Sequence, residues 1–237
     1  PCRPEDRETL LHTFVRVEGM EISVLRTAVE WSWTDTAGYL LAIERARAAL
    51  NVGMLVGHCA LRQYVMGEDS VERAATAEEI ATMQALLSEA IEAGALGFST
   101  NQNPRHMRDD GKPLPSRLAD EGELRALGQV LGDLGRGVIQ MSSAPGGAAR
   151  IDRLADFSLA IGRPIVWHAI LHSWAHPAAW RDQLLAPERA FTRGARAWAN
   201  TNARAFNNRF TLKNAQEFDE FPTWSALMFA SHEDRRE

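Results

Sequence analysis

The chain has 237 residues, a formal net charge of −5, and 45% hydrophobic against 24% charged residues. This composition is typical of a soluble globular protein with enough apolar residues for one large domain or two small ones. The mild acidity argues against a nucleic-acid partner, which needs clustered positive charge, and no apolar run approaches the ~20 residues that a membrane helix needs.

Helical patterns and short apolar runs alternate along the chain. Helices are predicted at residues 7–30 and 35–50, then after Thr76, after Asp120, and at 151–161 and 177–185. Strands are predicted at residues 51–57, 95–100, 137–141, 164–168 and 195–199. Each strand candidate is apolar on consecutive residues, as expected where both faces of a parallel strand are covered.

Two of the predicted helices carry clear end signals. Thr76 and Glu79 have the spacing of a capping box, and apolar residues follow at helical intervals until Gly94, a typical C-terminal glycine. Asp120 opens the second helix, and Gly135 ends it.

Strand–helix alternation repeated four or five times predicts an α/β fold with a parallel sheet. An open doubly wound sheet and a barrel both fit this pattern. The chain has no GxGxxG after a strand and no GxxxxGK[ST], so nucleotide-binding folds lack their signature. A (β/α)₈ barrel needs eight strands and typically about 250 residues, so a barrel formed by this chain would lack strands.

Two segments lie outside the alternation. Residues 101–118 form a polar loop directly after a predicted strand, where the functional face of a barrel lies. Residues 206–237 contain two aromatic clusters and no clear period. We therefore expect an α/β domain over residues 1–205 and a separate C-terminal segment, 206–237, to which no structure is assigned.

Polar side chains follow the predicted strands at their carboxyl ends. Because these ends share one face of a parallel sheet, we expect His58, Thr100, Gln140 and His168 to open onto one cavity. We interpret His58, Thr100, Gln140 and His172 as substrate-binding candidates, and His168 as a candidate metal ligand. Each has a plainer alternative, which for His58 is a hydrogen bond at a strand end.

Other polar residues favour structural roles. Cys59 is adjacent to His58 on a predicted strand, where neighbours point to opposite sides, so a small buried residue is the plainer interpretation. With only two cysteines and no CxxC pair, we expect a reduced, cytoplasmic setting. Asp109 and Asp110 precede Gly111, as in a turn. His176 continues the four-residue spacing of His168 and His172, so a metal site shared by these histidines remains an alternative.

Several segments together resemble one known family. Residues 55–66 (LVGHCALRQYVM) resemble the "VGHSxLRxxVM" segment of D-aminoacylases, and residues 74–83 and 89–100 resemble the following helix and "GAxGxST" strand. Residues 110–117 (DGKPLPSR) resemble a loop of one divergent subgroup, and residues 1–7 resemble the segment directly after its "GNCG" turn. The match is collinear over about residues 1–180 and identifies the D-aminoacylase branch of the amidohydrolases.

This resemblance implies a (β/α)₈ barrel that holds one or two zinc ions, with a small β-sandwich beside it. A metal-bound hydroxide would attack the amide of a small N-acyl-D-amino acid. The family's HxH and cysteine ligands would precede Pro1, and its aspartate would follow Glu237. Its middle-strand histidines would fall where Gln140 and Met141 stand, and near His168.

The resemblance therefore predicts a partial barrel without its first and last strands or its β-sandwich, and with poor activity on its own. Two rival interpretations stay open. One is an α/β enzyme that binds a phosphorylated small molecule, for which residues 144–148 (APGGA) are the candidate loop. The other is a degenerate, non-catalytic barrel fragment. The sequence indicates no oligomeric state.

Overall fold

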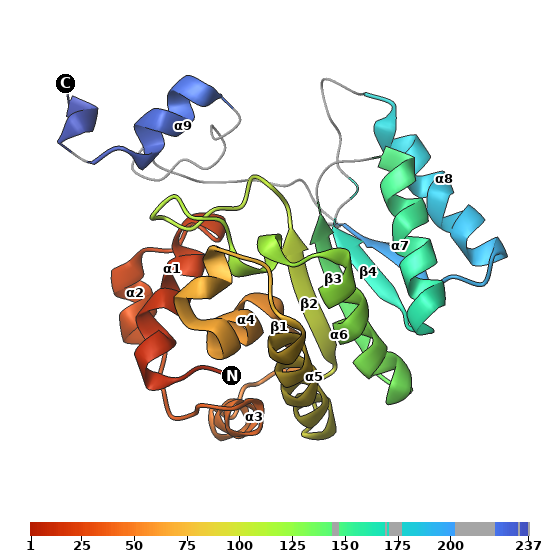
Figure 1. Cartoon of the computed structure of the whole chain (residues 1–237), viewed down its shortest axis with the longest axis horizontal. Coiled ribbons are helices and arrows are strands. Elements are labelled where there is room, and N and C mark those ends of the chain that lie inside the picture. Colours follow the sequence, from red (N-terminus) through yellow and green to blue (C-terminus); the bar gives the residue numbers. More distant parts are fainter. Residues whose placement is uncertain (144–146, 169, 171–176, 202–220, 232, 237) are drawn as a thin grey trace.

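A five-stranded parallel sheet forms the centre of the computed structural model (Figure 1), which describes residues 1–143, 147–168, 170, 177–201, 221–231 and 233–236. The strand order is β1-β2-β3-β4-β5, so each strand pairs with its neighbours in the chain. The strands are β1 (Leu55–Gly57), β2 (Gly97–Gln102), β3 (Val138–Ser143), β4 (Ile165–His168) and β5 (Ala197–Asn200). The prediction of parallel neighbours in chain order is confirmed.

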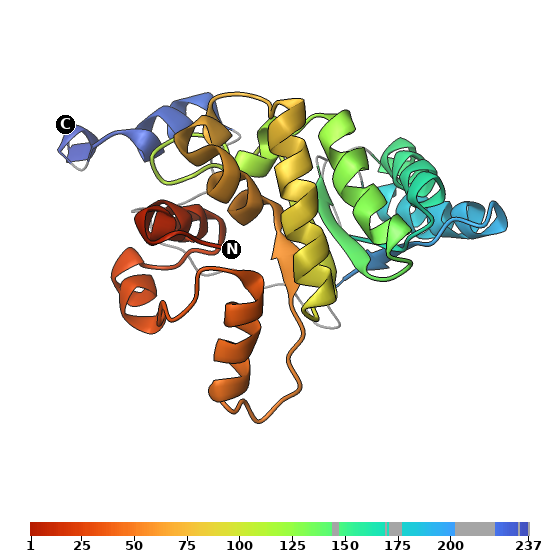
Figure 2. The same ribbon diagram turned by 60° about the horizontal axis from the view of Figure 1, so that its bottom comes forward.

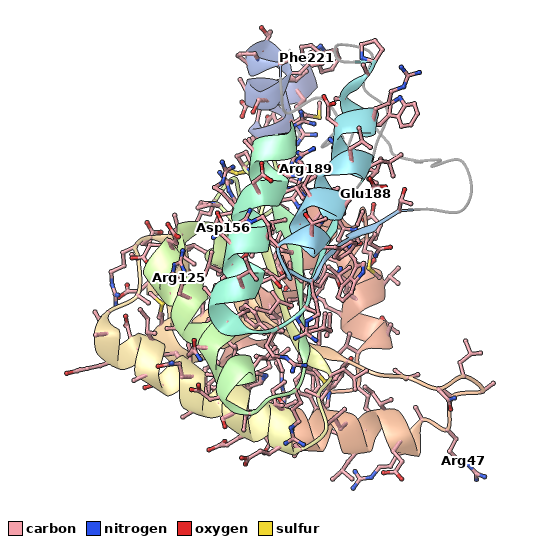
Figure 3. All side chains as sticks on the ribbon, turned by 90° about the vertical axis from the view of Figure 1, so that its right-hand side faces the viewer. Arg47, Arg125, Asp156, Glu188, Arg189 and Phe221 are labelled. Carbon is pink, nitrogen blue, oxygen red and sulfur yellow. The ribbon has the colours of Figure 1, made fainter. Side chains whose placement is uncertain are left out.

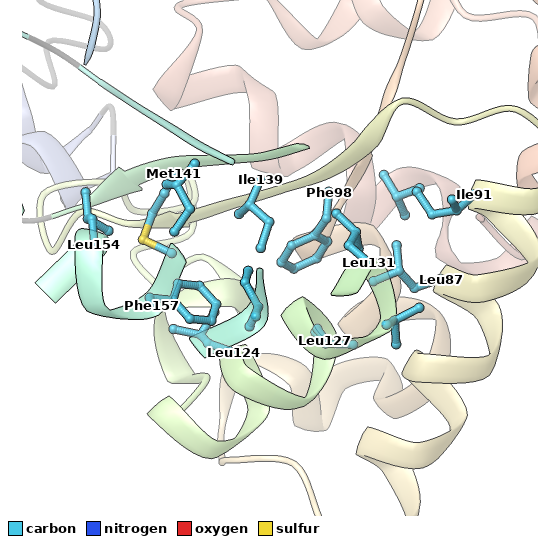
Figure 4. Close-up of a cluster of buried hydrophobic side chains, with 14 of the residues drawn as sticks. Leu87, Ile91, Phe98, Leu124, Leu127, Leu131, Ile139, Met141, Leu154 and Phe157 are labelled. Atoms are coloured by element: carbon cyan, nitrogen blue, oxygen red, sulfur yellow. The ribbon is translucent and has the colours of Figure 1, made fainter. Parts of the chain in front are cut away.

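Four helices cover one face of this sheet (Figure 1). They are α5 (Ala77–Glu92), α6 (Glu121–Asp133), α7 (Gly147–Ile161) and α8 (Ala179–Thr192). Apolar side chains of the strands and helices interlock between the two layers (Figure 4), among them Phe98, Ile139, Leu87, Leu127 and Phe157. Charged side chains such as Arg125, Asp156 and Arg189 lie on the solvent side of the same helices (Figure 3).

The helix ends follow the predicted signals. Thr76 Oγ1 accepts the backbone N–H of Glu79, and the Glu79 carboxylate accepts the backbone N–H of Thr76 at 2.7 Å, which completes the capping box of α5. Gly94 follows this helix with φ +117°. Asp120 accepts the backbone N–H of Glu123 at 2.8 Å and so caps α6.

The N-terminal segment, residues 1–45, packs beside β1 rather than over the sheet (Figure 2). It contains a 3₁₀ turn (Pro4–Asp6) and the helices α1 (Arg7–Val17), α2 (Ile22–Ala28) and α3 (Thr36–Arg45). The predicted helix over residues 7–30 is thus two helices, separated at Gly19, whose φ is +62°. None of the helices in the described segments has the length and apolar character to cross a membrane.

The helix that follows β1 was not predicted. The segment after β1 forms α4 (His58–Met66), followed by a 3₁₀ helix over Gly67–Val71. His58 and Cys59 are therefore the first residues of a helix, and the expectation that they continue a strand is wrong. Gly57, the N-cap of α4, provides no side-chain hydrogen bond that could mark this boundary.

The loop after β2 is held by contacts at its tip and its end. Asp109 accepts a hydrogen bond from His12 of α1 at 2.8 Å, and Lys112 forms an ion pair with Glu72 at 2.8 Å. The Asp110 carboxylate accepts the backbone N–H of Lys112, as expected for a turn before Gly111. A short 3₁₀ helix, Pro115–Leu118, then leads into α6.

A helix also forms in the C-terminal segment. This helix, α9 (Pro222–Phe229), is followed by a 3₁₀ turn (Asp234–Arg236), and the guanidinium of Arg16 lies 4.2 Å from the ring centroid of Phe229. Residues 202–220 lie outside the described residues, so the predicted domain boundary near residue 205 stays a prediction.

Gly97 provides a test of the β2–β3 pairing. Its φ is +153°, and a Cβ added there would lie 1.9 Å from the carbonyl oxygen of Val138 on the neighbouring strand. We expect Gly97→Ala to lower the free energy of unfolding by about 3 kcal/mol, because the strands must separate or the backbone must strain. Urea denaturation followed by circular dichroism measures this change.

The matched control is Gly57→Ala. Gly57 ends β1 with φ −78°, and an added Cβ there would meet no atom within 4 Å. Equal losses of stability in the two variants would contradict the close approach at Gly97.

Candidate functional site

The strand register assigns the predicted site residues to opposite faces of the sheet. Thr100 pairs with Met141, and Gln140 lies between Ile139 and Met141 on the next strand. Both apolar residues pack in the core beneath the helices. Because successive strand residues point to opposite faces, Gln140 points away from the helices and Thr100 points toward them.

Gln140 and His168 meet on the face opposite the helices. His168 follows Trp167, whose side chain is buried in the core, so the imidazole points to the other face. There the amide of Gln140 forms a hydrogen bond with Nε2 of His168. Burial lowers the pKa of His168, and the positive charge of Arg150 lowers it further, so the imidazole is neutral.

Arg150 of α7 supports this end of β4 from its own helix. Its guanidinium donates to the carbonyl oxygen of His168 and lies 5.1 Å from the ring centroid of Trp167. The backbone of His168 is therefore held by Arg150, while its side chain is held by Gln140.

Other uncharged polar residues extend this pair across the sheet. The register places Asn101, Ser142, His168 and Asn200 side by side on four neighbouring strands, which we call the polar row. Asn101 also contacts Nδ1 of His106 at 2.5 Å. Burial is the largest cause that lowers the pKa of His106. The loop after β2 therefore brings a second neutral imidazole to this row.

The described residues do not complete a metal site. Among them, no group of three or more His, Cys, Asp or Glu side chains is placed to hold an ion. A catalytic zinc ion usually takes three protein ligands. His168 contributes one imidazole here, and its Nε2 already contacts Gln140. His172 and His176 lie outside the described residues, so their predicted roles stay predictions.

His58 lies in a separate, buried network on the face of the sheet that the helices cover. Its Nδ1 is 2.9 Å from the hydroxyl of Thr100, and its Nε2 is 2.7 Å from Oε1 of Glu123. The other carboxylate oxygen of Glu123 accepts a hydrogen bond from Arg62, which also donates to the carbonyl oxygen of Arg73 at 2.7 Å. The side chains of His58, Arg62 and Glu123 are at most 1% exposed.

The protonation states in this network follow from its charges. Burial raises the pKa of Glu123, but hydrogen bonds from His58 and Arg62 outweigh it, and the net pKa lies below the ordinary value. Burial is the main cause that lowers the pKa of His58, against the pull of Glu123. An ionised carboxylate only accepts, so neutral His58 donates from Nε2 and accepts the Thr100 hydroxyl at Nδ1.

The expectation of one cavity shared by four residues is therefore wrong. His58 and Thr100 hydrogen-bond to each other beneath the helices, whereas Gln140 and His168 meet on the opposite face. The error has two causes: a helix begins at His58, and strand parity separates Thr100 from Gln140. The substrate-binding role of Gln140 stays a prediction.

Cys59 has the buried character that the sequence favoured. Its thiol donates to the hydroxyl of Ser116 at 3.2 Å, and burial raises the pKa of that thiol. A reactive thiolate is therefore not favoured at this position.

Two members of the buried network were missed in the sequence. Glu123 and Arg62 lie on helices, where charged residues are usually solvated. A signal existed, because Glu123 precedes Leu127 by four positions and so lies on the apolar face of α6. No comparable signal distinguishes Arg62.

A model described as "Amidohydrolase family" matches residues 13–221 of the chain. The N-acyl-D-glutamate deacylase of Alcaligenes xylosoxydans xylosoxydans is 31% identical over 150 residues, which cover 62% of this chain and 28% of that protein. The N-acyl-D-aspartate deacylase of the same organism is 53% identical over 62 residues, covering 26% of this chain and 12% of that protein.

Solved structures show the same fold. A D-aminoacylase described as having a binuclear metal center has a TM-score of 0.60 and 24% identity, and the match covers 73% of this chain and 34% of that one. The N-acyl-D-glutamate deacylase of Bordetella bronchiseptica, complexed with zinc and a phosphonate inhibitor, has a TM-score of 0.54 and 26% identity, with 70% and 33% covered. The match thus spans about a third of each of these chains.

Glu123→Gln tests the buried network. This change removes the charge that balances Arg62 while keeping the shape, and we expect a loss of about 3–5 kcal/mol in the free energy of unfolding. Chemical denaturation at pH 7.5 measures it. The control is Glu121→Gln on the same helix, since the Glu121–Arg125 ion pair is exposed and its loss should cost below about 1 kcal/mol. Similar losses in both variants would contradict a buried, unscreened Glu123.

The same network predicts acid sensitivity. The pKa of folded His58 lies below its unfolded value of about 6.5, so the unfolded chain binds more protons as the pH falls below that value. Stability is therefore complete above about pH 6.5 and declines below it. The lowered pKa of Glu123 adds a further loss below its own ordinary range.

His58→Gln should flatten the decline between pH 6.5 and 5, measured as the midpoint of urea unfolding at closely spaced pH values. His106 and His168 also have lowered pKa values, so the difference between wild type and variant is the relevant quantity. An unchanged slope in the variant would show that His58 does not titrate as proposed.

Proposed function

The chain belongs to the amidohydrolase family, and we propose that it supplies five barrel strands of a metal-dependent hydrolase that cleaves C–N bonds other than peptide bonds. The observation that carries this proposal is the polar row. It lies at the carboxyl ends of parallel strands, on the face opposite the helices, where the active sites of (β/α)₈ enzymes lie.

Small N-acyl-D-amino acids are the proposed substrates. Similarity to the D-aminoacylase branch supports this proposal, since two of the relatives are deacylases of N-acyl-D-glutamate and N-acyl-D-aspartate. The polar row offers hydrogen-bond donors and acceptors for such a molecule. Gln140 is the described residue that we assign to substrate binding, together with the neighbouring His168.

Zinc is the proposed metal, because the deacylase structure from Bordetella bronchiseptica contains it. The described residues of this chain do not form its ligand set. They enter the proposal as groups that bind and orient the substrate, and as the buried support behind the sheet.

A non-catalytic barrel is the second candidate, and the incomplete ligand set among the described residues favours it. The third, an enzyme for phosphorylated ligands, depends on the loop at residues 144–148, of which 144–146 lie outside the described residues.

The test is an assay of the 237-residue chain with N-acetyl-D-glutamate, N-acetyl-D-aspartate and their L-enantiomers, in the presence of zinc. We expect D-selective release of the free amino acid, abolished by a chelator. The rate should be roughly a thousandfold below that of a full-length deacylase, because a weakly held metal forfeits several kcal/mol of transition-state stabilisation.

The control reaction is the full-length deacylase under the same conditions. If zinc-loaded chain produces no D-selective turnover, the catalytic proposal fails and the non-catalytic barrel is favoured. A rate equal to that of the full-length enzyme would show that the chain holds a complete metal site.

A further inference from the structure

The contact between Gln140 and His168 uses Nε2 of the imidazole, an atom that could otherwise bind a metal. Gln140 pairs with Val166, and His168 pairs with Ser142, so the two side chains are diagonal neighbours on one face. Their terminal nitrogens are in hydrogen-bond contact. An amide nitrogen only donates, so Nε2 of His168 is the acceptor in this contact and carries no proton.

The direction of this hydrogen bond decides what His168 can do. When the Gln140 N–H donates, the lone pair of Nε2 is used and the proton of the neutral imidazole is on Nδ1. His168 then has no free lone pair for a metal. Its Nδ1–H remains a donor that suits a carbonyl oxygen.

Among the described residues, the polar row beside the pair is uncharged. Asn101, Ser142 and Asn200 flank it in the polar row, and their side chains carry no charge. The nearby guanidinium of Arg150 donates to the backbone carbonyl of His168. With the Arg150 cation directed at the backbone, the side chains of the pair and of the polar row suit a neutral amide or acyl carbonyl better than a carboxylate or a cation.

We propose that Gln140 and His168 form a metal-free recognition pair for the uncharged amide group of the substrate. The inference rests on the proposed function, and it assigns to these strands a role different from metal binding. The related solved structures contain metals, but that observation concerns those proteins and does not make His168 a ligand here. In this chain, a metal would be held by residues other than His168.

Imidazole nitrogen NMR on the ¹⁵N-labelled chain tests the proposal directly. The His168 signals are assigned with a His168→Gln variant. We expect zinc chloride to leave the Nδ1 and Nε2 signals of His168 in place. N-acetyl-D-alaninamide, which presents neutral amides, should shift them in a saturable manner, whereas sodium acetate should not.

A zinc-induced shift or broadening of the His168 signals would overturn the proposal, because it would make His168 a metal ligand. The absence of any shift with N-acetyl-D-alaninamide would also overturn it, because the pair would then recognise no amide. A larger shift with acetate than with the amide would contradict the preference for a neutral group.

A gain-of-function variant provides a second measurement. Gln140→His places two imidazoles on neighbouring strands, and zinc prefers such nitrogen ligands. We expect this variant to bind zinc about tenfold or more tightly than wild type in equilibrium dialysis, and zinc should then shift the His168 signals. The control is Gln84→His on α5, where the glutamine donates to the carbonyl oxygen of Ala126 in the helix layer.

If Gln140→His folds by circular dichroism and gains no zinc affinity, the pair is not placed as the structure indicates. These results do not depend on turnover. A chain without hydrolase activity but with an amide-responsive, zinc-indifferent His168 would refute the proposed catalysis and retain the recognition pair.

Discussion

The carboxylate of Glu123 is the interaction on which this end of the fold depends. It accepts hydrogen bonds from His58 and Arg62 of α4, while His58 also contacts Thr100 of β2. One buried charge thus joins α6, α4 and β2. Such an arrangement is stabilising only when complete, because desolvating a carboxylate and a guanidinium costs several kcal/mol that their mutual contacts must offset.

The buried network on the helix-covered face also fixes side-chain directions on the opposite face of the sheet. Thr100 is held by His58, and strand residues alternate, so the position of Thr100 determines where Ser99 and Asn101 point. Asn101 begins the polar row, which continues to His168 and Asn200. The charged network and the proposed recognition surface are therefore two sides of the same strand ends.

Local chemistry made much of the fold predictable. The capping box at Thr76, the N-cap at Asp120 and the apolar strand runs specify their elements over short stretches of chain. The start of α4 could not be found in this way. Gly57 gives it no side-chain cap, and its first turn continues the apolar pattern of β1.

The candidate site was less predictable, because it depends on register and on distant partners. Gln140 lies on a strand as predicted, but β3 extends three residues beyond it, and the face it occupies depends on how β2 and β3 align. The buried state of Glu123 depends on Arg62, 61 positions earlier in the chain. Neither relation is encoded in the spacing of neighbouring residues.

The distribution of charge across the sheet has its own logic. Ionised groups lie beneath the helices, where Glu123 and Arg62 neutralise each other within a fully buried contact. On the opposite face, the described side chains of the polar row and of Gln140 are amides, a hydroxyl and a neutral imidazole, which need no counter-charge. A neutral surface loses little when it exchanges water for a ligand amide, whereas an unpaired charge would lose its solvation. These strands therefore suit the polar, uncharged part of a substrate, and any charge recognition must come from groups beyond the polar row.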